Sequence, residues 1–150
     1  MIPICSNVVS GVAISIVSGE AKMALMKRSM EGFWCHIAGK VEVGEAGWQA
    51  IVREFFEETK IVVEELYSGD YIEQFYVAKE NRIDMIPVFV VYCPPDQKIV
   101  LNHEHTEYKW CSLDEAKSLV PYPNQKALYE HVWNNFVVDK PSSYMRIETS

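Results

Sequence analysis

The spacing of hydrophobic and polar residues changes several times along the chain, and each change predicts a new element. Two short apolar runs, Val8 to Ser18 and Met23 to Lys27, are separated by Ser-Gly-Glu, which predicts a β-hairpin. His36 to Val43 is a shorter strand-like segment. From Gly47 to Thr59 the apolar residues recur at helical spacing, which predicts an amphipathic helix with an apolar stripe formed by Trp48, Ile51, Val52, Phe55 and Phe56.

Strand-like segments return after this helix. β-Branched and aromatic residues are enriched in three stretches, Ile61 to Glu64, Tyr71 to Val77 and Ile83 to Tyr92. Pro87 lies inside the last stretch, and because proline cannot donate a ladder hydrogen bond it predicts a bulge or an edge position. Beyond the turn at Cys93-Pro-Pro-Asp, two more short strands are expected at Ile99 to Leu101 and Tyr108 to Cys111.

The C-terminal third is predicted to be mainly helical. Ser112 and Glu115 have the spacing of a capping box, which predicts a helix start. Asn124 to Val137 reads as a final amphipathic helix, whereas residues 139–150 are expected to be a loosely held tail. This order of elements predicts one α/β domain over residues 1–150, with a mixed sheet and helices on both of its faces.

Composition and charge narrow the functional classes. The formal net charge is -7, so the chain lacks the broad basic surface that nucleic-acid polymers or anionic membranes require. No window approaches the run of about 18 to 20 apolar residues that a membrane span needs. The four cysteines are scattered, which favours reduced thiols, and we expect a cytoplasmic location.

The predicted helix at Gly47 to Thr59 carries an acidic cluster. At about 100° per residue, Glu54, Glu57 and Glu58 fall on one face, opposite the apolar stripe. Arg53 is the one basic residue within this helix. Like charges at this spacing repel one another, and hard divalent cations prefer oxygen ligands. The cluster is therefore either a solvated acidic surface or a platform for Mg²⁺.

Residues around the cluster resemble the signature of the Nudix hydrolase family. That signature is Gly, five residues, Glu, seven residues, then Arg-Glu-apolar-x-Glu-Glu-x-Gly-apolar. Gly39, Glu45 and the segment Arg53-Glu-Phe-x-Glu-Glu-x-Lys-Ile61 match every fixed position except the second glycine, which is Lys60. The resemblance implies an α/β/α sandwich that hydrolyses phosphoric anhydride bonds.

The resemblance also implies roles for individual residues. It makes Glu54, Glu57 and Glu58 ligands of Mg²⁺, or of Mn²⁺ in its place, with the Gly39 carbonyl as a further ligand. A salt bridge between Arg53 and Glu45 is expected to orient the helix, which would keep Arg53 from neutralising the metal-binding carboxylates. Lys60 would need another helix exit or a strained backbone, because glycine normally supplies positive φ at this position.

Three stretches outside the signature resemble bacterial dihydroneopterin triphosphate pyrophosphatases and related dATP-hydrolysing members. They are Lys27-Arg28 with Phe33-Trp34, then Glu104-His-x-x-Tyr-Lys-Trp110, then Asn124-Gln-x-Ala127. The resemblance implies that Glu104 is a metal ligand or catalytic carboxylate. Lys27 and Arg28 are candidates for phosphate binding or for ordinary edge-strand charge, and Trp34 for ring stacking or for the core. The histidines show no metal-ligand spacing.

The predicted activity is Mg²⁺-dependent cleavage of a nucleoside or pterin triphosphate to a monophosphate and pyrophosphate. Water would attack a phosphorus, with Glu57, Glu54 or Glu104 as the general base and Arg53 as the orienting cation. Alternatives are a nucleotide-sanitising or dinucleotide-polyphosphate hydrolase of the same fold, a non-catalytic nucleotide-binding module, and a structural acidic domain. The expected partner is a small-molecule triphosphate, and the oligomeric state, a homodimer included, stays open.

Overall fold

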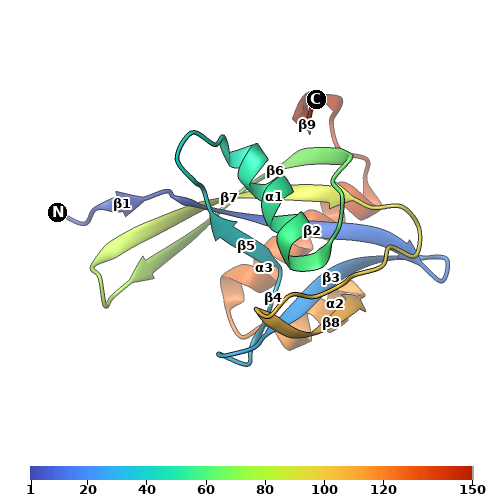
Figure 1. Ribbon diagram of the computed structural model, residues 1–150, viewed down its shortest axis with the longest axis horizontal. Coiled ribbons are helices and arrows are strands. Elements are labelled where there is room, and N and C mark those ends of the chain that lie inside the picture. Colours follow the sequence, from blue (N-terminus) through green and yellow to red (C-terminus); the bar gives the residue numbers. More distant parts are fainter. Residues whose placement is uncertain (150) are drawn as a thin grey trace.

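A mixed, strongly twisted β-sheet forms the centre of the protein, described here by a computed structural model over residues 1–149 (Figure 1). The main strand order is β4-β3-β2-β7-β6-β9, while β1 pairs with β7, β5 with β2 and β8 with β3. β7 runs parallel to β1 and β2, and the other pairings are antiparallel. The strands are β1 (Ile4–Cys5), β2 (Val8–Val17), β3 (Glu20–Arg28), β4 (Trp34–Cys35), β5 (Ile37–Lys40), β6 (Glu65–Val77), β7 (Arg82–Tyr92), β8 (His105–Cys111) and β9 (Arg146–Ile147).

Helices cover both faces of this sheet, which confirms the predicted α/β/α sandwich. On one face lies α1 (Gly47–Thr59); on the other lie α2 (Leu113–Leu119) and α3 (Pro123–Val132). β2 shows how the sequence serves both layers, because its alternate side chains enter different cores. Ala13 belongs to the cluster beneath α1, and Val12 to the cluster beneath α2 and α3.

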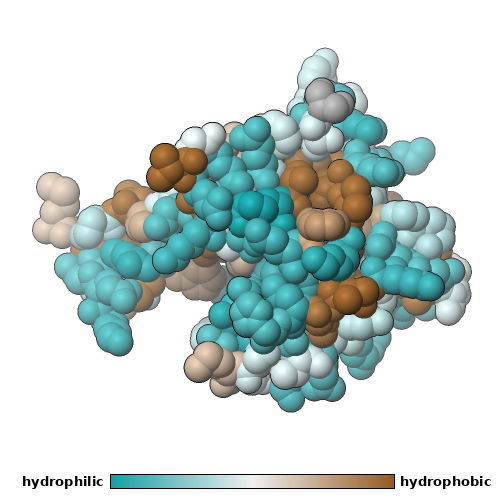
Figure 2. Space-filling view, viewed as in Figure 1, coloured by the Kyte–Doolittle hydropathy of each residue, from teal (hydrophilic) through white to brown (hydrophobic). Residues whose placement is uncertain are grey.

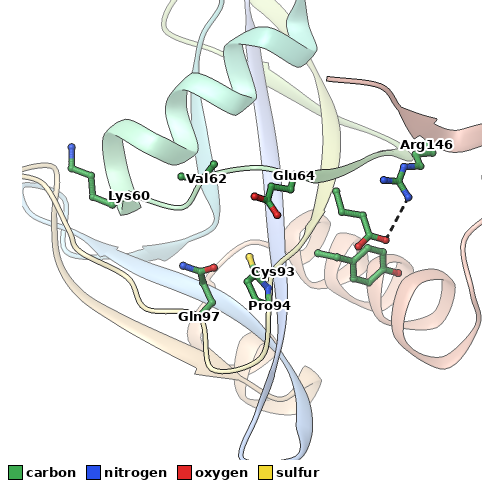
Figure 3. Close-up of a pocket in the computed structure, with 9 residues that line it drawn as sticks. Lys60, Val62, Glu64, Cys93, Pro94, Gln97 and Arg146 are labelled. Carbon is green, nitrogen blue, oxygen red and sulfur yellow. Dashed lines mark ion pairs between the residues drawn. The ribbon is translucent and has the colours of Figure 1, made fainter. Parts of the chain in front are cut away.

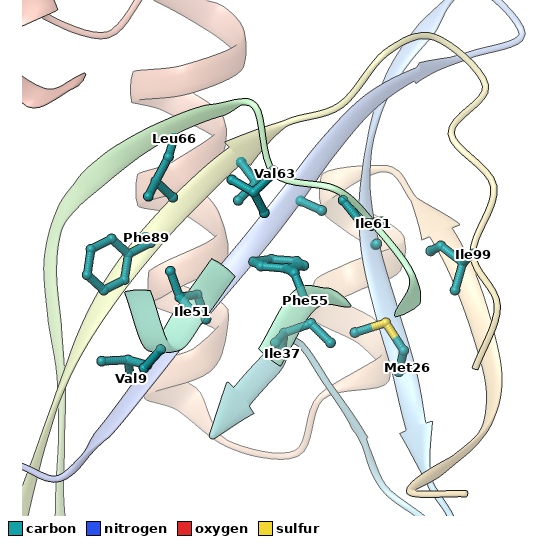
Figure 4. Packing of buried hydrophobic residues seen from close by; sticks show 14 residues of the cluster. Val9, Met26, Ile37, Ile51, Phe55, Ile61, Val63, Leu66, Phe89 and Ile99 are labelled. Atoms are coloured by element: carbon teal, nitrogen blue, oxygen red, sulfur yellow. The ribbon is translucent and has the colours of Figure 1, made fainter. Parts of the chain in front are cut away.

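The core beneath α1 fixes where that helix lies against the sheet (Figure 4). Ile51 and Phe55 are 0% and 1% exposed, and burying side chains of this size contributes about 1.5–3 kcal/mol each. Gly11 on β2 allows the close approach, since a Cβ there would lie 2.7 Å from Cε2 of Phe55 and 2.9 Å from Cγ1 of Ile51. The apolar stripe and this glycine together place the acidic side of α1 near β5.

Most elements predicted from the sequence are confirmed. The hairpin of β2 and β3 turns at Ser18 and Gly19, which both have positive φ. The bounds of α1 are those predicted. Pro87 lies in the interior strand β7 and pairs with Ile72 at the border of an irregularity of β6 between Ser68 and Ile72, so it flanks a bulge and is not in an edge strand.

Two predicted strands are wrong. Residues 61–64 and 99–101 lie in irregular connections, although Ile61 and Ile99 are buried in the α1-side core. Their apolar character reflects burial, and neither segment finds a partner strand. Val100 instead donates its backbone N–H to the carbonyl of Thr59, which closes the end of α1.

The C-terminal region is more ordered than expected. The Ser112 and Glu115 capping box of α2 is present, and α3 continues into a π-helical turn at Trp133–Val138. Residues expected to be loose form a short 3₁₀ turn at Ser143–Met145 and then β9, which pairs with β6. The tail is held because Met145 and Ile147 pack against the two cores. Ser150 lies outside the described residues.

The cysteines and the helix lengths of residues 1–149 bear on two predictions made from composition. All four cysteines are free thiols, in agreement with the scattered pattern of the sequence. Within that range, no helix is both long enough and apolar enough to cross a bilayer.

Candidate active site

The carboxylates of α1 meet a glutamate that is far away in the sequence. Glu58 is 2% exposed, and the loop before β8 brings Glu104 to it. His105, the first residue of β8, completes a group whose ligand atoms lie within 4.8 Å of one another. The loop therefore places Glu104 next to the acidic helix, together with His105, which shows no metal-ligand spacing in the sequence.

Burial controls the protonation of this cluster. Burial, strengthened by the neighbouring Glu104 and Glu54 carboxylates, raises the pKa of Glu58 to about 10. The Glu58 carboxyl in turn lowers the pKa of Glu104, so the pair shares a single proton. Burial also lowers the pKa of the His105 imidazole.

The cluster is short of hydrogen-bond partners. Within residues 1–149, Glu58 Oε2 and His105 Nδ1 are both buried without one. A buried polar atom left unpaired costs about 1–3 kcal/mol. A divalent cation would displace the shared proton and accept electron pairs from these atoms, so the residues present fit the metal that the signature implies.

Arg53 forms the predicted salt bridge with Glu45 and also contacts Lys40, Glu54 and Glu57. Its Nε and Nη2 bind the two carboxylate oxygens of Glu45 at 2.8 and 2.9 Å, and Nη2 also donates to the Lys40 carbonyl at 2.9 Å. The expectation that Arg53 leaves the acidic cluster alone is wrong. Nη1 lies 2.8 Å from Glu54 Oε1 and 3.3 Å from Glu57 Oε2, because the guanidinium has a third nitrogen facing the helix.

A cleft of about 620 Å³ opens beside the cluster, a size typical of small-ligand sites. Gly39 forms part of its wall, and a Cβ there would lie 2.2 Å from Cδ of Glu54. A side chain at this position would therefore displace the Glu54 carboxylate, in addition to any effect on the Gly39 carbonyl. The lining residues that carry charge are Arg28, Glu31, Lys40, Glu54 and Glu104.

Six of the predicted site residues do not line this cleft: Lys27, Trp34, Glu45, Arg53, Glu57 and Glu58. Adjacent strand residues point to opposite faces of a sheet, so Arg28 lines the cleft while Lys27 lies on the other side and pairs with Glu107 at 3.5 Å. Trp34, which pairs with Lys27 in the sheet, packs against the core beneath α2 and α3. The Glu57 side chain is 52% exposed and extends toward Arg53.

The loop that carries Glu104 is held by two residues without an assigned role. Ser29 donates its N–H to the Glu104 carbonyl at 2.9 Å and its hydroxyl to the His103 carbonyl at 2.7 Å. Asn102 accepts the Glu104 N–H on its side-chain oxygen at 3.0 Å, as turn asparagines often do. Local sequence could have suggested Asn102, whereas the role of Ser29 depends on a contact between distant segments.

Lys60 replaces the signature glycine without changing the helix exit. Its φ is 61° and ψ 12°, the left-handed conformation that glycine normally supplies, so the expectation of backbone strain holds and a new exit geometry is not used. Its ammonium lies 4.8 Å from the centre of the Phe56 ring. Lys60 points away from the carboxylate cluster.

Lys60 instead borders a second hollow, of about 520 Å³, at the C-terminal end of α1 (Figure 3). This hollow lies between the segments after α1 and after β7, and it contains none of the signature carboxylates. Beside the hydrophilic surface of α1, Figure 2 shows hydrophobic surface, and the exposed apolar residues of the flanking segments are Val62 and Val100. The cleft lined by Glu54 and Glu104 is therefore the candidate active site.

The sandwich presents one buried and several partly exposed carboxyl groups beside an open cleft, an arrangement that can hold a divalent cation next to a small ligand. Comparison with known proteins identifies the family, because a model of the NUDIX domain matches residues 8–132. The chain belongs to the Nudix hydrolase family.

The similar proteins are named for different activities. The chain is 30% identical over 138 residues to the dihydroneopterin triphosphate diphosphatase of Escherichia coli, covering 82% of this chain and 91% of that protein. It is 33% identical over 118 residues to an octanoyltransferase of Myxococcus xanthus, where it covers 74% of this chain but spans only about a third (33%) of that protein. A Caenorhabditis elegans Ap4A hydrolase, solved as a binary complex, has a TM-score of 0.75 at 25% identity, over 87% of this chain and 96% of that one.

Proposed function

We propose that this protein is a magnesium-dependent pyrophosphohydrolase that cleaves a nucleoside or pterin triphosphate to the monophosphate and pyrophosphate. The observation that carries the proposal is the buried Glu58 carboxyl, which meets Glu104 at the edge of a cleft that also contains Arg28. The similarity to dihydroneopterin triphosphate diphosphatase supports a triphosphate substrate.

In this proposal Glu54, Glu58 and Glu104 hold Mg²⁺ or Mn²⁺ together with the Gly39 carbonyl, and Glu57 joins them if its side chain turns away from Arg53. The bound cation would neutralise negative charge on the phosphates and make the phosphorus easier to attack. The salt bridge between Arg53 and Glu45, with contacts of 2.8 and 2.9 Å, holds the helix that carries these carboxylates.

Arg28 is the proposed phosphate-binding residue. Its guanidinium lines the cleft and is paired with Glu31 at 3.0 Å, on the protein surface. A phosphate offers the same bidentate geometry with more negative charge, so it can replace Glu31 as the partner of Arg28. This exchange would bring the substrate phosphates next to Glu104.

A carboxylate of the cleft would accept the proton of the attacking water. Arg53 contacts both Glu54 and Glu57, but only Glu54 and Glu104 line the cleft, so we favour one of these two as the base. Glu104 is held ionised by its neighbour, while burial raises the pKa of Glu54 and makes it the stronger proton acceptor. Separate Glu54→Gln and Glu104→Gln variants, each followed over pH, distinguish the two.

The structural likeness to an Ap4A hydrolase supports a second candidate, hydrolysis of a dinucleotide polyphosphate. The two activities share the same carboxylate chemistry and differ in what the cleft accepts beyond the reacting phosphates. The open form of the cleft is compatible with a longer substrate.

A hydrolysis panel tests both candidates. Dihydroneopterin triphosphate, the eight common nucleoside triphosphates, oxidised purine triphosphates and diadenosine tetraphosphate are incubated with and without Mg²⁺, and all products are identified. Release of pyrophosphate from a triphosphate, lost in Glu58→Gln and kept in the exposed Glu64→Gln, supports the proposal. Preferential cleavage of the dinucleotide selects the second candidate, and the absence of any Mg²⁺-dependent product refutes both.

A further inference from the structure

His105 is a buried residue for which the reaction as described has no use. It is 5% exposed, and its Nδ1 lies 3.9 Å from Glu58 Oε1. The neighbouring Arg28 guanidinium is engaged with Glu31 and does not satisfy this edge of the ring. Among the residues that the structure describes, this imidazole nitrogen has no hydrogen-bond partner, and it faces a carboxylate cluster.

A β-bulge turns His105 toward this cluster. Tyr108 and Trp110 lie on the β8 face that contacts the α1-side core, and regular alternation would place Thr106 next on that face. Lys27 pairs with Glu107, but Arg28 pairs with His105, so Thr106 is an extra residue in β8. Bulges commonly re-aim a side chain next to active sites, and this one directs His105 to Glu58.

The donor set of the cluster is mixed. Glu58, Glu104 and His105 can each contribute one ligand atom, and the two most buried members also have the unpaired atoms. Among the described residues, the atoms of this cluster without a hydrogen-bond partner are one carboxylate oxygen, Glu58 Oε2, and one imidazole nitrogen, His105 Nδ1. A cation in contact with all three residues would satisfy both kinds of donor.

We propose that His105, through Nδ1, is a nitrogen ligand of the cation held by Glu58 and Glu104. This inference rests on the proposed metal-dependent function and adds to it a ligand beyond the signature. Imidazole suits transition-metal ions better than Mg²⁺, which prefers oxygen. The site should therefore bind Co²⁺ with a preference that depends on His105.

Pulsed electron paramagnetic resonance of the Mn²⁺-loaded protein tests the ligand directly. The wild-type protein is expected to show ¹⁴N modulation of the Mn²⁺ signal, which changes to ¹⁵N modulation when histidine is isotopically labelled. This experiment needs no substitution and does not depend on turnover. Bound Mn²⁺ without nitrogen modulation would overturn the proposal.

Two matched variants assign the nitrogen. His105→Gln should lose the modulation, and His103→Gln, a substitution in the adjacent loop, should keep it. Persistence of the modulation in His105→Gln, or its loss in His103→Gln, overturns the assignment. If His105→Gln does not fold, the labelled wild-type protein and His103→Gln still decide, because His36 and His131 contact Tyr129 and Gly69 and lie away from the cluster.

Calorimetric titration separates a ligand from a merely structural residue. His105→Gln should weaken Co²⁺ binding by at least about tenfold but Mg²⁺ binding by less than about threefold. Equal losses for the two cations would show that His105 only supports the carboxylates. If the protein hydrolyses its substrate with Mg²⁺ but the bound Mn²⁺ shows no nitrogen modulation, only this inference is refuted. If the protein binds no divalent cation, the proposed function is refuted as well.

Discussion

Lys60 offers a quantitative test of how the acidic helix ends. A non-glycine residue in the left-handed conformation costs about 1–2 kcal/mol, and glycine in the folded state costs about 0.5–1 kcal/mol of extra chain entropy. The exposed contact of the Lys60 ammonium with Phe56, at 4.8 Å, contributes about 0.5 kcal/mol. Lys60→Gly removes the strain and the contact, whereas Lys60→Ala removes only the contact.

We therefore expect the glycine variant to be more stable than the alanine variant by about 0.8 kcal/mol, which is the middle of the strain range less the middle of the entropy range. The wild-type protein should exceed the alanine variant by about 0.5 kcal/mol, the value of the lost cation–π contact. Urea unfolding monitored by tryptophan fluorescence measures these differences from the midpoints, provided that the slopes agree. Hydrolytic activity should change little, because Lys60 faces away from the carboxylates.

An alanine variant as stable as the glycine variant would refute the assignment of strain at φ 61°. A large loss of activity in both variants would show that Lys60 acts in the site. The matched pair matters because Lys60→Gly alone changes terms of opposite sign, whereas Lys60→Ala measures the lost contact by itself.

Three further substitutions test the site and the core. Gly39→Ala should lower Mg²⁺-dependent kcat/KM at least about tenfold, because the new Cβ would lie 2.2 Å from Cδ of Glu54 and would push that carboxylate out of place. Unchanged kinetics would contradict this expectation. Gly11→Ala should destabilise the fold by about 1–3 kcal/mol in urea, because its Cβ would lie 2.7 Å from Phe55, and a neutral result would mean that α1 can shift freely. In EDTA, stability should fall as pH rises from 4.5 toward about 10, because folded Glu58 keeps a proton that the unfolded chain releases. Glu58→Gln should flatten that decline in thermal melts, and an unchanged slope would assign it to other groups.

Local sequence was sufficient where the geometry is local. The position of Glu54 and Glu58 on one helix face follows from the helical repeat. Arg53 reaches Glu45 because Glu45 lies just before the start of α1, two turns of helix away. The extent of α1 and the hairpin of β2 and β3 were predictable for the same reason. Ile61 and Ile99 show the limit, since an apolar run indicates burial but does not specify a partner strand.

The sequence by itself determined the family, the acidic helix and its orienting salt bridge, because these depend on residues within a few turns of one another. Only the tertiary structure decided that Arg28 and not Lys27 lines the cleft, since strand register selects the face. It also decided that a bulge at Thr106 turns His105 toward Glu58, which lies 47 positions earlier in the chain. Register and bulges depend on which strands pair, and that pairing is set by long-range packing that no local pattern specifies.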